Sequence, residues 1–539
     1  MRRYAGLALL LGAGAAPCRA HWWNYTHGAL MMGNDAMPHG QHSLAQAFDL
    51  CANISDCRGF TYESPSTNFT GTADVYFKTS TYGNLDSGWS TYLRDAPPSP
   101  PAVPKLVNPC IDPKSTSSKA RWCNADLPID ERVDDMVSRM SVSEKIGALR
   151  DESAPIKSLE LPYYDWWSEA THGVASGGHG ARNTLLEPYQ TNFPFPITTG
   201  MAFNRSLWKA TGAQIGLEAR AFMNSGNAFS TFWAPVINLA REPRWGRNIE
   251  CPGEDPYLSG EYAVSFVHGM ERSPADPGHI QASACCKHYA ANSMEHTTEG
   301  GETFTRHNFD ANITMRDLVD SYLAPFQACV EKGKVSGLMC SYNAVNGKPA
   351  CADSWLLQDV ARDAWGFDGY ITSDCGAEAD VFYNHHYTNT PEESVAAVLR
   401  AGTDNDCGGF FGKNAQSALD KKLIAEADLD ARLRNLFRVR MRLSHFDPKG
   451  PLDEVPPSVI CSPAAVATAR DSVAQSVALL KNAKGALPLR KAALQSVAVI
   501  GPNAKQPWEI TSYYGPSTTC NGTAWNMVEN TIWGPIFFS

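Results

Sequence analysis

Residues 365–378 read WGFDGYITSDCGAE, and this stretch decides the fold. It opens with a glycine-punctuated turn, continues as a short aromatic and β-branched run, and stops at Ser373 and Asp374. A buried strand that ends in an exposed carboxylate is how a parallel α/β protein presents a catalytic group. Asp374 also fits a second interpretation, in which it caps the next helix. The rest of the sequence has to decide between a catalytic role and a helix-capping role for Asp374.

The same pattern recurs between residues 160 and 445, where apolar runs end in polar residues or glycine and helical stretches separate them. The other expected strands are residues 229–237, 282–286, 335–340 and 401–403. The expected helices are residues 205–224, 256–271, 315–332, 353–364 and 391–400. This alternation predicts an α/β fold with a parallel sheet. A TIM-like (β/α)8 barrel fits better than an open sheet, because a barrel gathers polar strand ends onto one face.

Composition and charge exclude several classes of function. The chain has 539 residues, of which 43% are hydrophobic and 19% charged, and this length allows two or three domains with a sizeable core. Its net charge is −10 and no long basic run occurs, so neither nucleic acid nor an anionic membrane surface is an expected partner. No phosphate-cradling glycine loop follows the first strand, which argues against a dinucleotide-binding fold.

Residues 1–20 are typical of a secretory signal peptide, with Arg2 and Arg3 before an apolar run and small alanines near the end. The run is too short to span a bilayer, and no later run is long enough. The 15 cysteines favour an oxidising compartment. Asn-x-Ser/Thr sites agree with export and lie at Asn24, Asn53, Asn68, Asn204, Asn312 and Asn521. We therefore expect a secreted, extracellular protein without a membrane anchor.

A small α+β module is expected at residues 21–95. A helix at residues 44–51 precedes aromatic strands at 59–62, 75–78 and 89–93, and a disulfide between Cys51 and Cys57 pins them. This module resembles the PAN/apple family, which implies binding of protein or carbohydrate. An N-terminal extension that is held by a disulfide and has no separate function fits these residues equally well.

Domain boundaries follow from shifts in composition. Residues 96–109 form a proline-rich, semi-rigid linker. The barrel domain spans residues 110–445 and begins with a local disulfide between Cys110 and Cys123, followed by a helix at residues 129–150. A linker with a helix covers residues 446–475. Residues 476–539 start a second α/β sandwich domain with a buried strand at 497–500, and about 60 residues cannot complete such a domain.

The expected strand ends carry charged and hydrogen-bonding residues beside aromatic ones. The main groups are residues 166–169, 244–250, Lys287 with His288, residues 341–343, and Asp374. Sugar sites need this mixture, because aromatic faces stack on a pyranose while charged groups hold its hydroxyls. Neighbouring cations would keep a buried aspartate ionised, as a glycosidic nucleophile requires.

Other interpretations of these residues remain open. Lys287 and His288 also fit an ordinary pair at a strand end, and Trp166 and Trp167 also fit core packing. Metal binding is disfavoured, since the adjacent pair His385-His386 cannot easily share one ion and no zinc-spaced set occurs. Residues 285–286 are cysteines within an apolar run and are expected in the core or in a disulfide. A G-x-S-x-G nucleophile elbow is missing from the sequence. We expect neither a metal nor an organic cofactor.

A set of long, ordered segments resembles glycoside hydrolase family 3, within its β-xylosidase and α-arabinofuranosidase branch. The segments are residues 164–174, 193–194, 233–238, 241–247, 254–257, 285–289, 339–347 and 369–375. Together they cover about residues 108 to 510. The chain departs from the family pattern at Phe232, at Val236 and along residues 289–295, which leaves fine specificity open.

The resemblance implies a retaining mechanism in which Asp374 is the nucleophile and forms a covalent glycosyl–enzyme. It implies that Arg247, Lys287 and His288 grip hydroxyls of the sugar in the first subsite. Tyr342 would lie beside the nucleophile.

Further roles also follow from the resemblance. Glu169 would bind a hydroxyl and by its bulk disfavour a sugar with a C6 hydroxymethyl group, which is a pentose signature. Trp167 would contribute to substrate binding. Cys375 would be bridged to Cys407.

The family's general acid/base is a glutamate of the second domain, beyond the residues that match here. A retaining glycosidase needs that second carboxyl. Glu169 resembles this general acid/base only in carrying a carboxylate charge, and the resemblance gives it a binding role. We therefore expect a secreted exo-β-glycosidase that releases xylose from xylo-oligosaccharides, with little activity in this form. The alternatives are a β-glucosidase, an α-arabinofuranosidase, or a non-catalytic carbohydrate-binding protein.

Overall fold

The computed structural model describes residues 107–175, 190–501, 514–516 and 520. In the first hundred residues it describes the segments 23–27, 29–30, 40–53, 57, 59–63, 72–78, 83–84 and 89–94. The chain divides into two compact units, Met1–Pro101 and Ala102–Ser539. Within the described residues, no helix combines the length and the apolar composition needed to cross a membrane.

The first unit contains an antiparallel sheet and one helix. The sheet order is β1 (Trp23–His27), β7 (Trp89–Arg94), β4 (Gly59–Glu63), β5 (Ala73–Lys78) and β3 (Gly40–His42). Short strands β2 (Ala29–Leu30) and β6 (Gly83–Asn84) pair separately. Helix α1 (Leu44–Asn53) buries Ala47 and Cys51 in a core with Phe60, Tyr62 and Phe77. A disulfide joins Cys51 to Cys57, as the sequence predicted.

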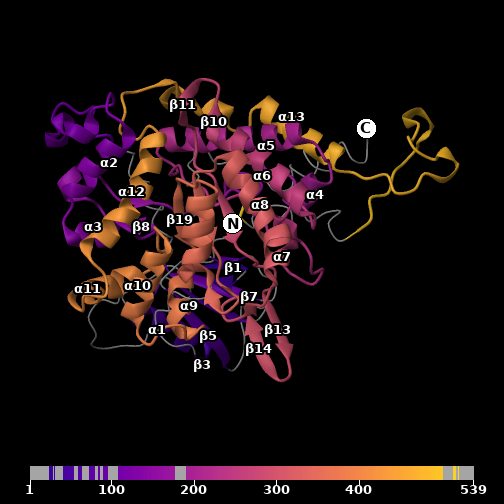
Figure 1. Cartoon of the computed structure of the whole chain (residues 1–539). Helices are drawn as coiled ribbons and strands as arrows, with labels where there is room; N and C mark the ends of the chain where they lie inside the picture. The colour runs from indigo at the N-terminus through magenta and orange to yellow at the C-terminus, as the bar shows by residue number, and fades with distance from the viewer. Residues whose placement is uncertain are drawn as a thin grey trace, which may run out of the picture. The chain divides into compact units, whose positions relative to one another are not determined.

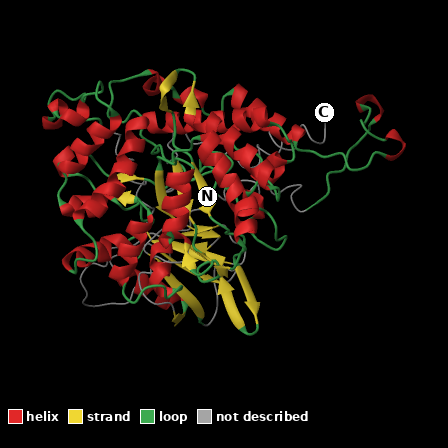
Figure 2. Ribbon diagram, in the orientation of Figure 1, coloured by secondary structure: helices red, strands yellow, loops and turns green. Residues whose placement is uncertain are grey.

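The centre of the second unit is a parallel sheet. Its hydrogen-bonded strands are β12 (Cys285–Tyr289), β16 (Gly337–Cys340) and β19 (Tyr370–Ser373), in that order. Every residue of these strands is buried, which matches their continuous apolar composition. Figure 2 shows helices surrounding these central strands.

Single bridges extend this sheet into a closed ring. On one side Val236 pairs with Lys287 in parallel. On the other side Thr372 pairs with Asn405, and Asp406 pairs with Arg150. Strands β8 (Glu152–Ser153) and β9 (Tyr164–Asp165) continue the ring, and the Trp233 amide donates to the Ser168 carbonyl (2.7 Å) to complete it. The barrel type predicted from the sequence is therefore present.

The ring departs from an all-parallel (β/α)8 barrel at one pair of strands, because β8 and β9 are antiparallel. A parallel connection needs a crossover of about a dozen residues or more, usually with a helix. Between Ser153 and Tyr164 the chain forms only the single turn η3 (Lys157–Leu159). This short connection forces the reversal.

Two outer helices have the predicted bounds, and they are α5 (Arg205–Asn224) and α6 (Pro256–Glu271). The Asn204 side chain caps α5, and Asp255 caps α6. Their backbones pack closely, since a Cβ at Gly269 would lie 2.1 Å from the Lys209 carbonyl oxygen. Further helices of this unit are labelled in Figure 1 and are α4 (Pro196–Gly200), α9 (Ala377–Tyr383), α10 (Pro391–Ala401), α11 (Phe410–Asp420), α12 (Glu426–Arg442) and α13 (Pro463–Gln475).

Other predicted helices are interrupted. The helix expected at 129–150 is two helices, α2 (Ile129–Ser138) and α3 (Val142–Ala148), because Ser141 and Glu144 form a capping box. The helix expected at 315–332 alternates α-helical and π-helical turns over residues 315–333. The helix expected at 353–364 is the π-helical segment η8 (Trp355–Ala364).

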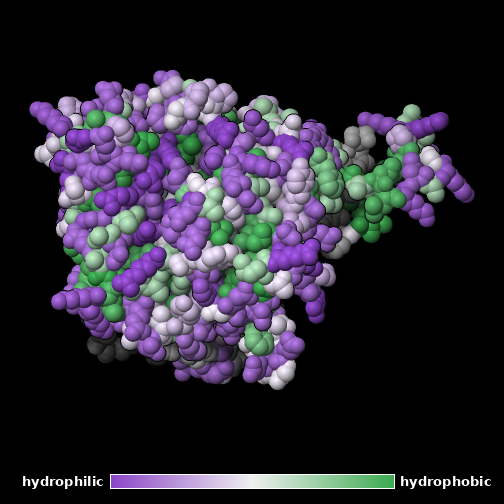
Figure 3. Space-filling view, in the orientation of Figure 1, coloured by the Kyte–Doolittle hydropathy of each residue, from purple (hydrophilic) through white to green (hydrophobic). Residues whose placement is uncertain are grey.

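The predicted buried strand at residues 497–500 is not observed. The segment forms no strand, and Ile500 is 91% exposed. Leu480, earlier in the same stretch, is 93% exposed. Figure 3 shows apolar side chains gathered on this segment, which is yellow in Figure 1. A strand needs a hydrogen-bonding neighbour, and the described residues provide none here.

Candidate active site

Asp374 lies directly after β19, at the carboxyl end of the parallel sheet. Its amide donates to the Cys340 carbonyl oxygen (3.0 Å), and its Oδ1 accepts a hydrogen bond from the Cys375 amide (2.8 Å). Its Oδ2 is buried and has no hydrogen-bond partner among the described residues. Helix α9 begins only after Gly376, and no side chain caps it. The structure therefore does not support the helix-cap interpretation of Asp374.

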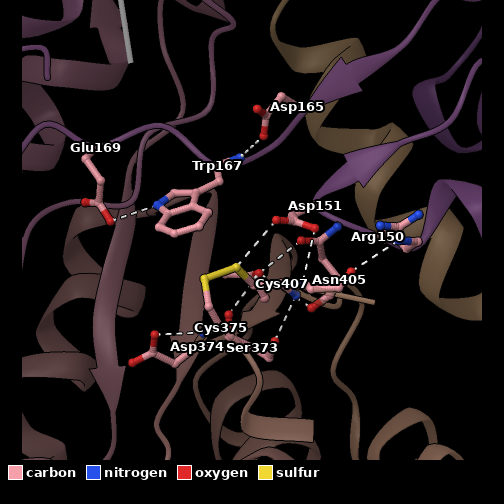
Figure 4. Close-up of a disulfide and its surroundings, with 12 residues drawn as sticks. Arg150, Asp151, Asp165, Trp167, Glu169, Ser373, Asp374, Cys375, Asn405 and Cys407 are labelled. Atoms are coloured by element: carbon pink, nitrogen blue, oxygen red, sulfur yellow. Dashed lines mark hydrogen bonds between the residues drawn. A yellow bond between two sulfur atoms is a disulfide. The ribbon is translucent and has the colours of Figure 1, made fainter. Parts of the chain in front are cut away.

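A buried ion pair lies on one side of the site. Lys287 Nζ donates to both carboxylate oxygens of Glu169 at 2.8 Å. The Trp167 indole N–H donates to the same carboxylate at 3.2 Å, as drawn in Figure 4. Burial raises the pKa of Glu169, and the Lys287 ammonium opposes that shift. Trp167 also stacks on Trp233, with ring centroids 5.7 Å apart.

A second buried ion pair joins Arg247 and Glu250 through two hydrogen bonds of 2.9 Å. Arg247 also donates to His288 Nε2 (3.1 Å), while His288 Nδ1 lies 3.2 Å from Asn238 Oδ1. Burial, followed by the charge of Arg247, holds the pKa of His288 well below its ordinary value. His288 is thus a neutral imidazole, so its 3.6 Å approach to Asp374 Oδ2 is not an ion pair.

Tyr342 contacts the residue that follows Asp374. Its hydroxyl donates to the Cys375 carbonyl oxygen (3.0 Å), and burial with the nearby Asp374 charge raises its pKa well above the usual value. The Arg306 guanidinium lies 4.9 Å from the Tyr342 ring centroid. Sequence reasoning missed Arg306, because it lies in the connection after the hairpin of β13 (His296–Glu299) and β14 (Glu302–Thr305) and not at a strand end.

The sequence also gave no sign of Tyr514 at the site. Its ring centroid lies 4.9 Å from Lys287 Nζ and 5.8 Å from Arg247 Cζ. The Thr171 amide donates to the Tyr514 carbonyl oxygen (2.9 Å), and a disulfide ties Cys520 to Cys461. A segment that follows the barrel by many residues therefore returns to cover two of its cations.

Replacing Tyr514 with alanine should expose Lys287 and Arg247 to water and weaken sugar binding several-fold, because a cation–π contact contributes about 0.5–2 kcal/mol. Tyr514→Phe keeps the ring and should behave like wild type. Cys461→Ser should reproduce part of the alanine effect by releasing the segment. Calorimetric measurement of xylose binding by the three variants checks these expected affinities. Equal affinities for all variants would contradict it.

Disulfides support the carboxyl end of the sheet. Cys375 pairs with Cys407, which joins the ends of two neighbouring ring segments (Figure 4). The second unit also contains the predicted Cys110–Cys123 bond. Further pairs are Cys286–Cys329 and Cys340–Cys351. Among the described residues, no cluster of His, Cys, Asp or Glu side chains has the arrangement of a metal site.

Asp151 is a buried carboxyl behind this disulfide, and its Oδ2 lies 3.5 Å from Cys407 Sγ. Burial raises its pKa to about 7, although the Gly408 amide donates to it. An unfolded aspartate titrates near pH 4, so between about pH 4 and pH 7 the unfolded chain loses a proton that the folded chain keeps. This group therefore lowers the free energy of unfolding as the pH rises through that window.

Asp151→Asn should remove this contribution. The stability of the variant relative to wild type should rise between pH 5 and pH 7.5, by on the order of 1 kcal/mol per pH unit. Thermal unfolding of both proteins at matched pH values measures the difference. Buried His288 and His445 titrate in both proteins, so their effects cancel. A difference that does not change with pH would contradict the assignment.

The barrel places paired charges and aromatic rings around Asp374, which is the mixture of groups that a sugar site needs. Residues 175–439 match the model of the Glycosyl hydrolase family 3 N terminal domain. The barrel of this chain is therefore similar to that domain.

Comparison with known proteins agrees. The chain is 44% identical over 403 residues to "Probable beta-D-xylosidase 7" of Arabidopsis thaliana, covering 73% of this chain and 52% of the relative. It is 42% identical over 400 residues to "Beta-xylosidase/alpha-L-arabinofuranosidase 1" of Medicago sativa subsp. varia, covering 73% and 51%. The chain thus spans about half the length of these curated relatives.

A solved structure of a family 3 exo-β-xylosidase, in complex with a xylobiose aziridine activity-based probe, has a similar fold. Its TM-score is 0.69 at 31% sequence identity. The match covers 77% of this chain and 55% of the other.

Proposed function

We propose that this protein is a retaining exo-β-xylosidase that releases xylose from the non-reducing ends of xylo-oligosaccharides. The observation that carries the proposal is Asp374 Oδ2, which is buried 3.6 Å from the neutral His288 and has no hydrogen-bond partner among the described residues. A carboxyl group in such surroundings suits a glycosidic nucleophile. The named relatives support a pentose as the sugar.

In the proposed reaction, Asp374 Oδ2 attacks the anomeric carbon of the terminal xylose while the bond to the leaving oxygen breaks. Water then attacks the covalent glycosyl–enzyme at the same carbon and releases xylose. Lys287, Arg247 and His288 hold the sugar hydroxyls. Because Glu169 and Glu250 fix the two cations in advance, little reorganisation accompanies the reaction.

Both steps also need a group that moves a proton. Glu169 accepts from Lys287 and Glu250 accepts from Arg247, so neither carboxylate is available for that role. We therefore propose that these two carboxylates do not assist the leaving group, so that the rate depends strongly on how readily that group leaves. An aryl group that leaves without protonation should react much faster than xylobiose.

The test compares 4-nitrophenyl β-xyloside, α-arabinofuranoside and β-glucoside. We expect the xyloside to react fastest and the glucoside slowest, because the bulk of Glu169 disfavours a C6 hydroxymethyl group. The arabinofuranoside is the second candidate substrate, because a relative carries both activities in its name. A 2-fluoro-xyloside with an activated leaving group should add one sugar to Asp374 by intact mass. Binding without any adduct would favour the non-catalytic alternative.

Secretion is also part of the proposal. Residues 1–20 have the pattern of a signal peptide, and the disulfides suit an oxidising compartment. Expression in a secreting host, followed by N-terminal sequencing of the protein in the medium, tests it. Protein that stays in the cells with residues 1–20 uncleaved would contradict it.

We further propose that the first unit is a PAN/apple-like module that binds carbohydrate or protein. Helix α1, packed on the aromatic face of an antiparallel sheet and pinned by the Cys51–Cys57 disulfide, supports the proposal.

A further inference from the structure

A histidine–aspartate pair lies near the site and has no role in the mechanism above. His307 Nδ1 lies 2.7 Å from Asp380 Oδ2, and the two residues are 73 positions apart in the chain. Asp380 belongs to α9, which begins three residues after Asp374. Its side chain is 8% exposed, whereas that of His307 is 37% exposed. A buried carboxylate therefore holds an imidazole that reaches the surface.

The imidazole is held in one orientation. Its ring packs against Tyr342, with centroids 4.3 Å apart, and Tyr342 in turn donates to the residue that follows Asp374. His307 thus packs on a residue that contacts the neighbour of Asp374. Asp380 occupies Nδ1, which directs Nε2 away from the carboxylate. Arg306 Nε lies 3.4 Å from His307 Nε2, which is too long for a strong hydrogen bond.

Anchoring α9 does not require this pair. His385, just after α9, already places Nε2 within 2.8 Å of the Tyr342 carbonyl oxygen. The Tyr387 amide donates to the Val381 carbonyl oxygen at 3.0 Å and closes the same turn. Asp380 Oδ1 accepts from the Asn384 side chain, and its Oδ2 fixes the ring direction of His307.

We propose that His307, oriented by Asp380, hydrogen-bonds a hydroxyl of the sugar on the leaving-group side of the scissile bond. This inference rests on the proposed function. An exo-acting site encloses the terminal sugar among buried groups, here Lys287, Arg247 and His288, so the leaving group must lie toward solvent. His307 is a partly exposed, preoriented polar group held beside Tyr342 and is therefore placed to meet that leaving group. Its ligand is the second pentopyranose unit of a xylo-oligosaccharide.

The test compares binding of xylose with binding of xylobiose by calorimetry, in the Asp374→Asn background so that no turnover occurs. Adding His307→Ala should weaken the binding of xylobiose about tenfold, since one oriented hydrogen bond is lost. The binding of xylose should not change. His307→Gln keeps a hydrogen-bonding group at this position and should recover most of the affinity. Asp380→Asn should weaken xylobiose several-fold, because the ring is no longer held. His386→Ala, at an exposed histidine in the loop after α9, is the matched control and should change neither affinity.

Two results would overturn the inference. If His307→Ala leaves xylobiose unchanged, or weakens xylose and xylobiose equally, His307 does not contact the leaving group. If the parent protein binds neither sugar, the proposed function fails first and this inference falls with it. Binding of xylose alone would leave the proposed function standing and would reject the second subsite.

Discussion

Replacing Asp374 with alanine is expected to lower the hydrolysis of 4-nitrophenyl β-xyloside by about 10⁴-fold, the largest effect of any single substitution in this chain. The variant lacks the carboxylate that would form the covalent intermediate. Azide should restore turnover of an activated xyloside and give a glycosyl azide of inverted configuration, because a small anion fills the space of the missing side chain. Labelling by the 2-fluoro-xyloside should disappear.

The matched control is Asp368→Ala. Asp368 lies on the same stretch, before β19, and pairs with Arg442 at the opposite end of the strand. The Asp368→Ala variant should retain wild-type activity. An Asp374→Ala protein that folds normally and keeps more than a tenth of the activity would show that another residue is the nucleophile.

The second large effect is expected on stability. Glu169→Ala leaves the ammonium of Lys287 buried, at 1% exposure, without its carboxylate. Removing one partner of a buried ion pair costs about 3–5 kcal/mol. The variant should therefore unfold at much lower denaturant concentration, and it should not bind xylose.

A double variant separates folding from sugar binding. In Glu169→Gln with Lys287→Met both charges are gone, so most of the lost stability should return. Binding of xylose should not return, since the cation that would hold a hydroxyl is absent. Denaturant unfolding and calorimetry measure the two properties. A double variant as unstable as Glu169→Ala, or one that binds xylose as wild type does, would contradict this account of the pair.

Features that are local in sequence were predictable. The bounds of α5 and α6 follow from Asn204 and Asp255, which cap them, and from the apolar spacing inside. The buried run before Asp374 is β19 as expected. The break in the helix expected at 129–150 also had a local signal, since Ser141 and Glu144 have the spacing of a capping box.

Features that depend on distant segments were not predictable. Nothing near Tyr514 shows that it returns to Lys287, and nothing near His307 shows that it meets Asp380. The antiparallel pair of β8 and β9 depends on the length of one connection, which apolar periodicity does not report. The residues 497–500 have the composition of a buried strand, but composition cannot supply the neighbouring strand that burial requires.

Closure of the ring has a consequence for biosynthesis. Asp151 meets Cys407, which is 256 residues later in the chain. At about 5–20 residues per second, a ribosome needs on the order of 10–50 s to make the intervening segment. Throughout that time the nascent barrel has an unpaired strand edge, which is a hazard for aggregation. The chain should therefore depend on chaperones during synthesis, and truncation before Asp406 should give insoluble protein even if every catalytic residue is present.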